Sequence, residues 1–171
     1  LAKTLNFGVI YGMGPATFAR RSGLSRRQAE QFIEQYFQYF SQVKIWQKKI
    51  ISAAGQKGFV ENRHGRKRWL PAINAPERFI ASGAERAAIN MPIQSLAADI
   101  MKMAMIKTRR RRLLLSIHDE LLFEIDNDKL KKIIPDIQSL MEGVCRLAVP
   151  LKVNVKVGDN WGTMKPWRDN C

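Results

Sequence analysis

The sequence predicts an α+β fold, in which most of the chain is helical and a few short strands pair in hairpins. Helical periodicity of apolar side chains covers most of residues 1–57 and recurs over residues 82–108 and 128–147. Two other segments, residues 59–70 and 113–125, carry strand-forming runs on either side of a short polar turn. Such segments predict hairpins and therefore antiparallel pairing.

The chain is strongly basic, with 29 Lys and Arg residues against 15 Asp and Glu residues and a formal net charge of +14. Solubility needs much less charge, so the excess indicates a polyanionic partner, most simply nucleic acid. A basic protein of the membrane surface is the alternative, but we find no basic amphipathic helix with a bulky apolar face. No run of 18 apolar residues occurs, so we expect no membrane-spanning segment and no membrane partner.

The N-terminal residues do not begin with Met, lack a signal-peptide pattern and fall inside a segment with helical periodicity. We therefore expect the 171 residues to be a piece of a longer chain. The two cysteines, Cys145 and Cys171, match neither a metal site nor a disulfide framework, which is compatible with a reducing compartment.

Residues 113–125 combine two apolar runs with the charged cluster His118-Asp119-Glu120. A single strand here would be about twice the usual length and would place Asp119 amid an apolar face, which is costly for an unpaired carboxylate. We therefore predict a hairpin with the cluster at its tip and two buried strands behind it. Adjacent carboxylates on a turn suit magnesium, which prefers oxygen ligands and can serve phosphoryl transfer. A solvated acidic turn without a chemical role explains the pattern equally well.

Lys3, Phe7 and Tyr11 recur at a spacing of four and share one face of a predicted helix over residues 1 to about 12. A cation beside two flat rings can bind a phosphate group and a base together. The alternative is an amphipathic helix whose aromatic side chains only pack. Nearby glycines allow another backbone or a nucleotide to approach this segment closely.

A short helix at about residues 16–22 and a long helix opened by the capping box Ser25–Gln28 are predicted next. Gly55 and Gly58 close the long helix. Residues 59–70 then form a hairpin with a basic end, which either is solvated or contacts a phosphate backbone. We interpret the apolar stripe of the long helix as core packing; it comprises Ala29, Phe32, Ile33, Tyr36, Phe37, Phe40, Val43, Trp46 and Ile50.

Arg86, Asn90 and Gln94 form a polar stripe at a spacing of four. Side chains that donate hydrogen bonds along one stripe could contact a nucleic-acid groove or brace a turn. Their helix is predicted to start at Ser82 and to be kinked or broken by Pro92.

The rest of the chain is predicted to form a helix over residues 128–147, a half-exposed strand over residues 151–157 and a turn over residues 158–162. Between the polar-stripe helix, which ends near Thr108, and the hairpin stands a run of four arginines, residues 109–112.

Three segments resemble motifs of the family A DNA polymerases, the relatives of bacterial DNA polymerase I. The family's fingers motif is similar to residues 3–12, KTLNFGVIYG, and its palm helix is similar to residues 85–100, which contain ERAAINMPIQ and AADI. Its final catalytic motif resembles residues 116–124, SIHDELLFE. All three occur in the family's order and spacing. The resemblance implies part of a right-hand polymerase fold, with mostly helical fingers over residues 1–75 and a C-terminal palm with an antiparallel sheet over residues 76–171.

The resemblance also implies roles for the residues of the first motif. Lys3 would bind the triphosphate of the incoming nucleotide, and Phe7 would lie against its base and sugar and disfavour dideoxynucleotides. Tyr11 would sit at the templating position.

In the other two motifs, the resemblance implies contacts to template and primer from Arg86, Asn90 and Gln94. His118 would approach the primer end. Asp119 would be a catalytic, metal-binding carboxylate assisted by Glu120, and two Mg²⁺ ions and the deoxynucleoside triphosphates (dNTPs) would take part.

The chain departs from the family pattern in several respects. The family's other metal-binding Asp belongs to a motif that is not in this sequence, and an arginine that precedes Lys3 in the family would fall before Leu1. The thumb is also missing, and the connection between Lys107 and Leu113 is shorter than in the family.

We therefore expect a template-directed DNA polymerase of a bacterial cytoplasm, associated with the nucleoid. Its partners would be primer-template DNA, dNTPs and the upstream part of the polymerase. The 171 residues by themselves are expected to be inactive. The alternatives are a non-catalytic DNA-binding half of a split polymerase and a metal-dependent nuclease, for which the carboxylates are too few.

Overall fold

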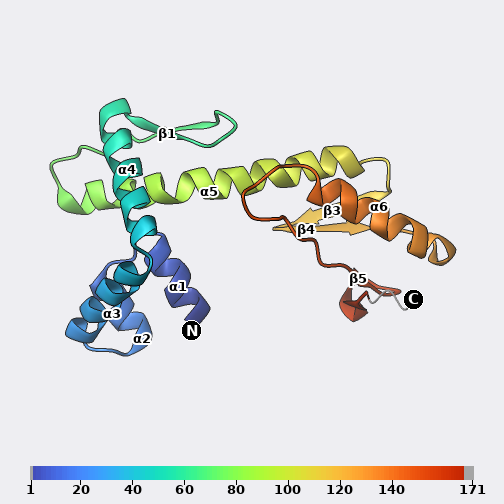
Figure 1. The fold of residues 1–171 in the computed structure, drawn as a ribbon, viewed down its shortest axis with the longest axis horizontal. Helices are drawn as coiled ribbons and strands as arrows, with labels where there is room; N and C mark the ends of the chain where they lie inside the picture. Colours follow the sequence, from blue (N-terminus) through green and yellow to red (C-terminus); the bar gives the residue numbers. More distant parts are fainter. Residues whose placement is uncertain (1, 168–171) are drawn as a thin grey trace. The chain divides into compact units, whose positions relative to one another are not determined.

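The structure is a computed structural model that describes residues 2–167, with only the backbone at residues 2 and 4. It divides into two compact units, Leu1–Leu96 and Ala97–Cys171. Helices dominate, and the described strands form separate two-stranded antiparallel sheets (Figure 1). The predicted α+β class is therefore confirmed. No helix in the described part of the chain is long and apolar enough to cross a membrane.

The first unit begins with helices α1 (Ala2–Ile10), α2 (Pro15–Ser22) and α3 (Arg26–Tyr39). Their apolar faces meet in a cluster of Val9, Phe18 and Ala29, which are at most 1% exposed. The predicted capping box is present, because the Ser25 hydroxyl accepts from the backbone N–H of Gln28 and the Gln28 side chain accepts from the Ser25 N–H.

The predicted long helix is in fact two helices, since Phe40 separates α3 from α4 (Ser41–Lys57). Phe40 leaves the helical region, with φ −103° and ψ 51°. The apolar stripe continues through the break, so periodicity cannot reveal one non-helical residue. Gly58 ends α4, as predicted, and adopts the left-handed conformation; the prediction that Gly55 also ends the helix is wrong, since Gly55 lies inside it.

The predicted small hairpin is confirmed as β1 (Phe59–Glu61) paired with β2 (Lys67–Trp69). A second apolar cluster joins the end of α4, this hairpin and the following helix. Its buried members are Ala54, Val60, Leu70, Ile73, Ala84, Ala88 and Met91.

Helix α5 (Arg78–Thr108) starts earlier than predicted and is continuous through Pro92, so of the two predicted effects of this proline, a kink or a break, the break does not occur. A proline inside a helix removes one backbone hydrogen bond and costs about 3 kcal/mol. Ala84, Ala88 and Met91 of the same helix are buried in the second cluster. Their packing offsets this cost and holds the helix together on the N-terminal side of the proline.

The second unit contains the predicted hairpin, formed by β3 (Leu113–Ile117) and β4 (Glu120–Phe123). The tip is His118 and Asp119 alone, since Glu120 already pairs with Ile117. The prediction of two buried strands is wrong: Leu114 and Leu115 are 53% and 48% exposed. A two-stranded sheet needs other elements on its faces to be buried, and the described residues leave this part of β3 open.

The hairpin leads through η1 (Asn127–Lys129) into α6 (Leu130–Glu142), which ends earlier than predicted. Side chains of α6 contact the backbone of Val153: the Gln138 amide donates to its carbonyl at 3.0 Å, and Glu142 accepts from its N–H at 2.9 Å. The chain after Gly143 must turn back to allow these contacts.

The predicted strand over residues 151–157 is reduced to β5 (Lys156–Val157), which pairs with β6 (Lys165–Pro166) after η2 (Trp161–Thr163). The expected alternation of exposed and half-buried side chains is present along the whole segment. However, α6 occupies both backbone hydrogen-bonding groups of Val153, so this residue is not available for pairing with another strand.

Candidate functional site

The predicted face of α1 is present in the structure. The rings of Phe7 and Tyr11 are nearly parallel, at an angle of 9° and with centroids 6.4 Å apart. Lys3 Nζ lies 5.9 Å from the centroid of the Phe7 ring, within the range of a cation–π contact. Phe7 is 46% exposed and Lys3 is exposed, so a flat, anionic molecule can reach this face.

The end of α1 is held in place by a residue that sequence reasoning missed. Gln47 of α4 is buried, and its amide donates to the carbonyl of Ile10 at 2.7 Å. Gly12 follows with φ 84°, and a Cβ atom there would meet Arg86 Cγ at 3.2 Å. The Gln47 bond holds the end of α1 next to Tyr11, and the glycine allows Arg86 to lie close to the backbone that follows. The only signal in the sequence is one amide among the apolar positions of α4, which does not identify its partner.

The polar stripe of α5 meets the face of α1 at Tyr11. The Gln94 amide donates to the Tyr11 hydroxyl at 3.1 Å, and the Arg86 guanidinium donates to Ser82 Oγ at 3.3 Å. Asn90 Oδ1 is buried and lacks a hydrogen-bond partner among the described residues. The first two predicted groups of residues, at 3–11 and 86–94, therefore lie side by side within one unit.

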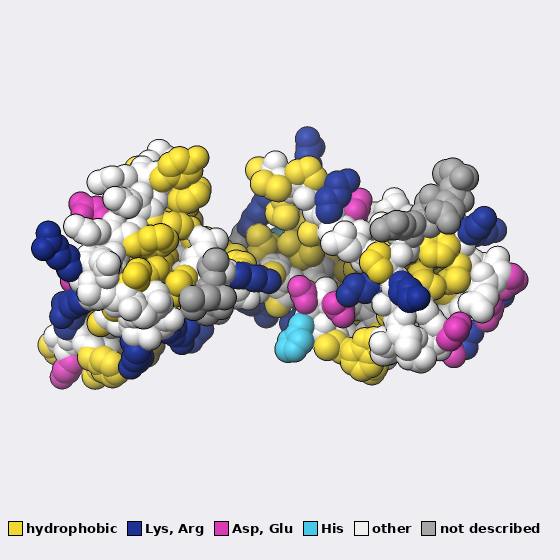
Figure 2. Space-filling view, turned by 90° about the horizontal axis from the view of Figure 1, so that it is seen from below, with side chains coloured by type: hydrophobic (Ala, Val, Ile, Leu, Met, Phe, Trp, Pro, Cys, Tyr) yellow, Lys and Arg dark blue, Asp and Glu magenta, His cyan; other side chains and the backbone are white. Residues whose placement is uncertain are grey.

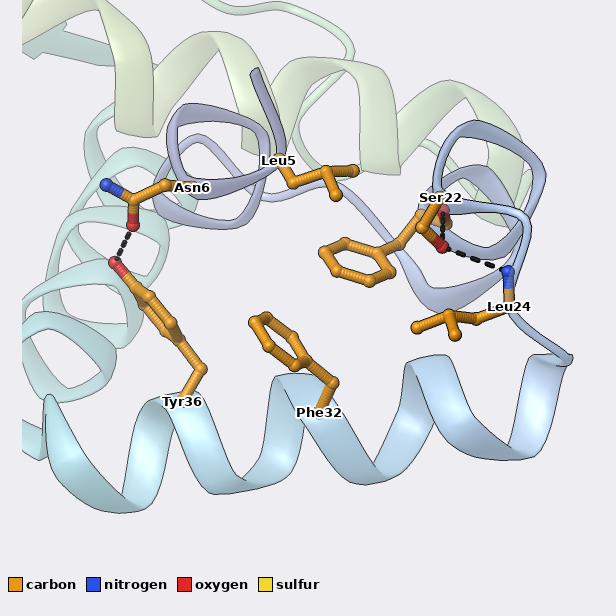
Figure 3. Close-up of a pocket in the computed structure, with 7 residues that line it drawn as sticks. Leu5, Asn6, Ser22, Leu24, Phe32 and Tyr36 are labelled. Carbon is orange, nitrogen blue, oxygen red and sulfur yellow. Dashed lines mark hydrogen bonds between the residues drawn. The ribbon is translucent and has the colours of Figure 1, made fainter. Parts of the chain in front are cut away.

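An apolar pocket of about 480 Å³ lies between α1, α2 and α3 (Figure 3). At one side of it the Tyr36 hydroxyl donates to Asn6 Oδ1 at 2.7 Å, and partial burial raises the pKa of Tyr36 above its ordinary value. None of Lys3, Phe7 and Tyr11 lines the pocket, so it is separate from the face described above. It is lined by Leu5, Asn6, Phe18, Ser22, Leu24, Phe32 and Tyr36.

In the second unit, His118 and Asp119 at the tip of the β3–β4 hairpin and Glu120 at the start of β4 are exposed. His118 adopts φ 52°, a conformation in which His is found more often than most residues. The described residues contain no cluster of three side chains able to hold a metal. Asp119 and Glu120 nevertheless fit part of a magnesium site, because Mg²⁺ is commonly bound by one or two carboxylates together with water and phosphate oxygens.

Basic side chains lie at several separate places on the face seen in Figure 2. Apart from that view, the β1–β2 hairpin also carries basic side chains: Lys67 Nζ lies 4.6 Å from the centroid of the Phe59 ring, and Phe59 contacts Trp69. Trp69 is 68% exposed. Cations beside exposed aromatic rings are suited to binding nucleic acid, because the rings can stack on bases and the cations can contact phosphates.

Comparisons with known proteins identify the family to which the chain belongs. The sequence pattern of the family described as "DNA polymerase family A" matches residues 1–163. The thermostable DNA polymerase I of Thermus aquaticus is 40% identical over 170 residues, which cover 96% of this chain and 20% of the relative. DNA polymerase I of Lactococcus lactis subsp. cremoris (strain MG1363) is 40% identical over 168 residues, or 94% of this chain and 19% of the relative.

A solved structure, described as the "POL domain of Pol1 from M. smegmatis complex with DNA primer-template and dNTP", is similar to this chain with a TM-score of 0.83 and 34% identity. The similarity covers 88% of this chain and 28% of that structure. The chain thus spans about a fifth of the length of the curated relatives it matches. Sequence and structure together show that the chain belongs to the family A DNA polymerases.

Proposed function

We propose that the chain is the fingers and C-terminal palm part of a template-directed DNA polymerase, which adds nucleotides from dNTPs to the 3′ end of a primer. Family membership supports this proposal, as do the names of the relatives, which are DNA polymerases I. The enzyme would act in the bacterial cytoplasm, with the upstream part of the polymerase as its partner in the same chain or in a second subunit.

The observation that carries the proposal is the junction of the α1 face with the α5 stripe at Tyr11. It joins a cation, two parallel rings and hydrogen-bond donors within one unit. In the proposed enzyme, Lys3 binds the triphosphate, Phe7 lies against the base and sugar, and Tyr11 marks the templating position. A point charge on a flexible side chain suits a triphosphate.

The α5 stripe and the hairpin tip would contact the DNA. Arg86, Asn90 and Gln94 would bind template and primer, and His118 would approach the primer end. The net charge of +14 adds affinity that does not depend on sequence and that falls as salt displaces the protein from phosphates.

Asp119, with Glu120 beside it, would hold Mg²⁺ in the proposed enzyme. When bound, the metal neutralises charge on the transferring phosphoryl group. The hairpin contributes by presenting one carboxylate on its turn and the other at the start of β4, where solvent and substrate can reach them.

A non-catalytic, DNA-binding half of a split polymerase is the second candidate. It is favoured by the net charge of +14, because the release of counterions from DNA needs no catalytic geometry. Primer extension with magnesium separates the candidates. We expect the 171 residues alone to bind primed DNA weakly and salt-dependently without extending it, and the upstream part added in trans to restore synthesis. Template-dependent extension by the 171 residues alone would show that they contain both metal-binding carboxylates, and would contradict the expectation that one of them lies in the upstream part.

The nucleotide-binding role of α1 is tested in the complete polymerase with Lys3→Ala. We expect a higher KM for dNTPs and little change in affinity for primed DNA, because a charge next to the triphosphate is lost. Lys44→Ala is the matched control, since Lys44 also lies over a ring, that of Phe37, at 5.3 Å, but on α4. Equal effects of the two substitutions on KM would refute the role of Lys3.

A further inference from the structure

The short connection between α5 and β3 is a tight reversal that contains an unusual residue. Arg111 N–H donates to the Thr108 carbonyl at 2.8 Å, directly after the helix ends. Arg112 then adopts φ 53°, in the left-handed region that residues other than glycine seldom occupy. Only residues 109–112 separate helix from strand, so the predicted short connection forms an ordered turn.

Arg112 contacts Glu124 twice across the open end of the hairpin. Its carbonyl accepts from the Glu124 N–H at 3.2 Å, and its Nη2 atom lies 2.7 Å from Glu124 Oε2. Its Nη1 atom also lies 3.6 Å from Asp126 Oδ1. A hydrogen bond from Lys129 at 2.5 Å, with Arg112 as a weaker contributor, lowers the pKa of Asp126, so this carboxylate is charged at neutral pH.

A β-bulge follows this contact immediately. Leu113 pairs with Phe123 and Leu115 with Leu122, so Leu114 is the extra residue on β3. If the regular pairing nearer the tip continued without a bulge, Leu114 would face Phe123, and Arg112 would lie opposite Ile125. The Glu124–Arg112 backbone bond therefore belongs to the bulged register.

The neighbouring Arg111 connects the same turn to α6. Its guanidinium lies 2.6 Å from Asp136 Oδ2, and α6 buries Ile134 and Ile137. The open end of the hairpin is thus anchored through both arginines, whereas Asp119 at the tip makes no described hydrogen bond or ion pair.

We propose that Arg112 is a positioning residue, which holds Glu124, thereby selects the bulge at Leu114, and so sets the direction in which the hairpin presents Asp119. This inference rests on the proposed role of Asp119. Bulges bend a strand, increase its twist and re-aim side chains next to active sites.

A small bend of the hairpin at Leu114 would move its tip, and with it Asp119, by a distance that matters for catalysis. At about 3.3 Å per residue, the tip lies about 13 Å from the bulge, so a change of about 10° at Leu114 moves it by about 2 Å. A misplacement of about 1 Å can lower a reaction rate about 100-fold. By contrast, an ion pair this exposed contributes little to stability: the two side chains are 60% and 58% exposed. The positioning role therefore predicts a loss of rate without a matching loss of stability.

The test uses the complete polymerase with Arg112→Glu, Glu124→Arg and the double charge swap. Arg112→Gly is a further variant, which accepts the left-handed conformation but lacks the guanidinium. Arg26→Glu is the matched control, because Arg26 forms an ion pair with Glu30 at 3.0 Å on α3, in which both side chains are also at least half exposed. The readouts are kcat and KM for dNTPs, the Tm, and hydrogen exchange of the peptide that covers residues 113–125.

We expect Arg112→Glu and Arg112→Gly to lower kcat about 10- to 100-fold with KM within about twofold, and to speed exchange in the hairpin. The double charge swap should restore most of kcat and slow hydrogen exchange in the hairpin again. Arg26→Glu should change neither kcat nor this exchange. Unchanged kcat and exchange in Arg112→Gly, or no recovery in the swap, would overturn the proposal. If the wild-type enzyme extends no primer, the proposed function fails, and hydrogen exchange alone still decides whether Arg112 holds the hairpin.

Discussion

Replacing Asp119 with Asn in the complete polymerase should separate chemistry from folding. Asp119 is exposed at the tip of the hairpin, and its side chain makes no hydrogen bond or ion pair with the described residues. Asn has nearly the same shape and is also a good turn residue. The free energy of unfolding should therefore change by no more than about 0.5 kcal/mol.

The effect on activity should be far larger. If Asp119 is a magnesium ligand, the substitution removes a charged oxygen from the group that neutralises the transition state, a loss of several kcal/mol. A loss of about 4 kcal/mol corresponds to a fall in kcat of about 1,000-fold. Affinity for primed DNA should stay within about threefold, because no cationic phosphate contact is removed.

The assay is single-turnover primer extension at saturating magnesium, with DNA affinity and Tm measured on the same preparations. Glu61→Gln is the matched control, since Glu61 is an exposed carboxylate next to the turn of the other hairpin. Extension by Asp119→Asn within about tenfold of the wild-type rate would refute the assignment of Asp119 as a catalytic ligand.

Three further substitutions test the first unit. Phe7→Tyr should raise the incorporation of dideoxynucleotides, measured in competition with dNTPs; an unchanged ratio would make Phe7 a packing residue. Phe18→Ala should lower the free energy of unfolding by about 3–5 kcal/mol in denaturant titrations, because the ring is 1% exposed and stacks on Phe32. Tyr11→Phe removes the bond to Gln94 and should destabilise the protein by about 0.5–1.5 kcal/mol. In a Gln94→Ala background, Tyr11→Phe should cause no such loss of stability. A loss that persists in that background would show that the bond between Gln94 and Tyr11 is not its cause.

Elements defined by contacts between near neighbours in the sequence were predictable. The Lys3–Phe7–Tyr11 face follows from a spacing of four on a helix, and the structure shows the two rings nearly parallel. The hairpin at residues 113–125 follows from two apolar runs and a polar turn. In both cases the residues that determine the structure lie within a few positions of one another, so the sequence displays them directly.

Interruptions and extensions of elements were less predictable. The break at Phe40 lies inside an uninterrupted apolar stripe, and Pro92 lies inside a helix that continues past it. Burial of Ala88 and Met91 in the second cluster outweighs the local preference at Pro92. Local propensities differ by about 1–3 kcal/mol, and burial of a few side chains provides as much.

The sequence by itself determined the α+β class, the hairpins and the residue types of the candidate site. Only the tertiary structure decided that Gln47 holds the end of α1, that Gln94 bonds Tyr11 across 83 positions of the chain, and that Arg112 pairs with Glu124. Such contacts depend on where packed helices and paired strands bring distant residues together. A sequence motif names the side chains that can react or bind, whereas packing fixes the direction in which the fold presents them.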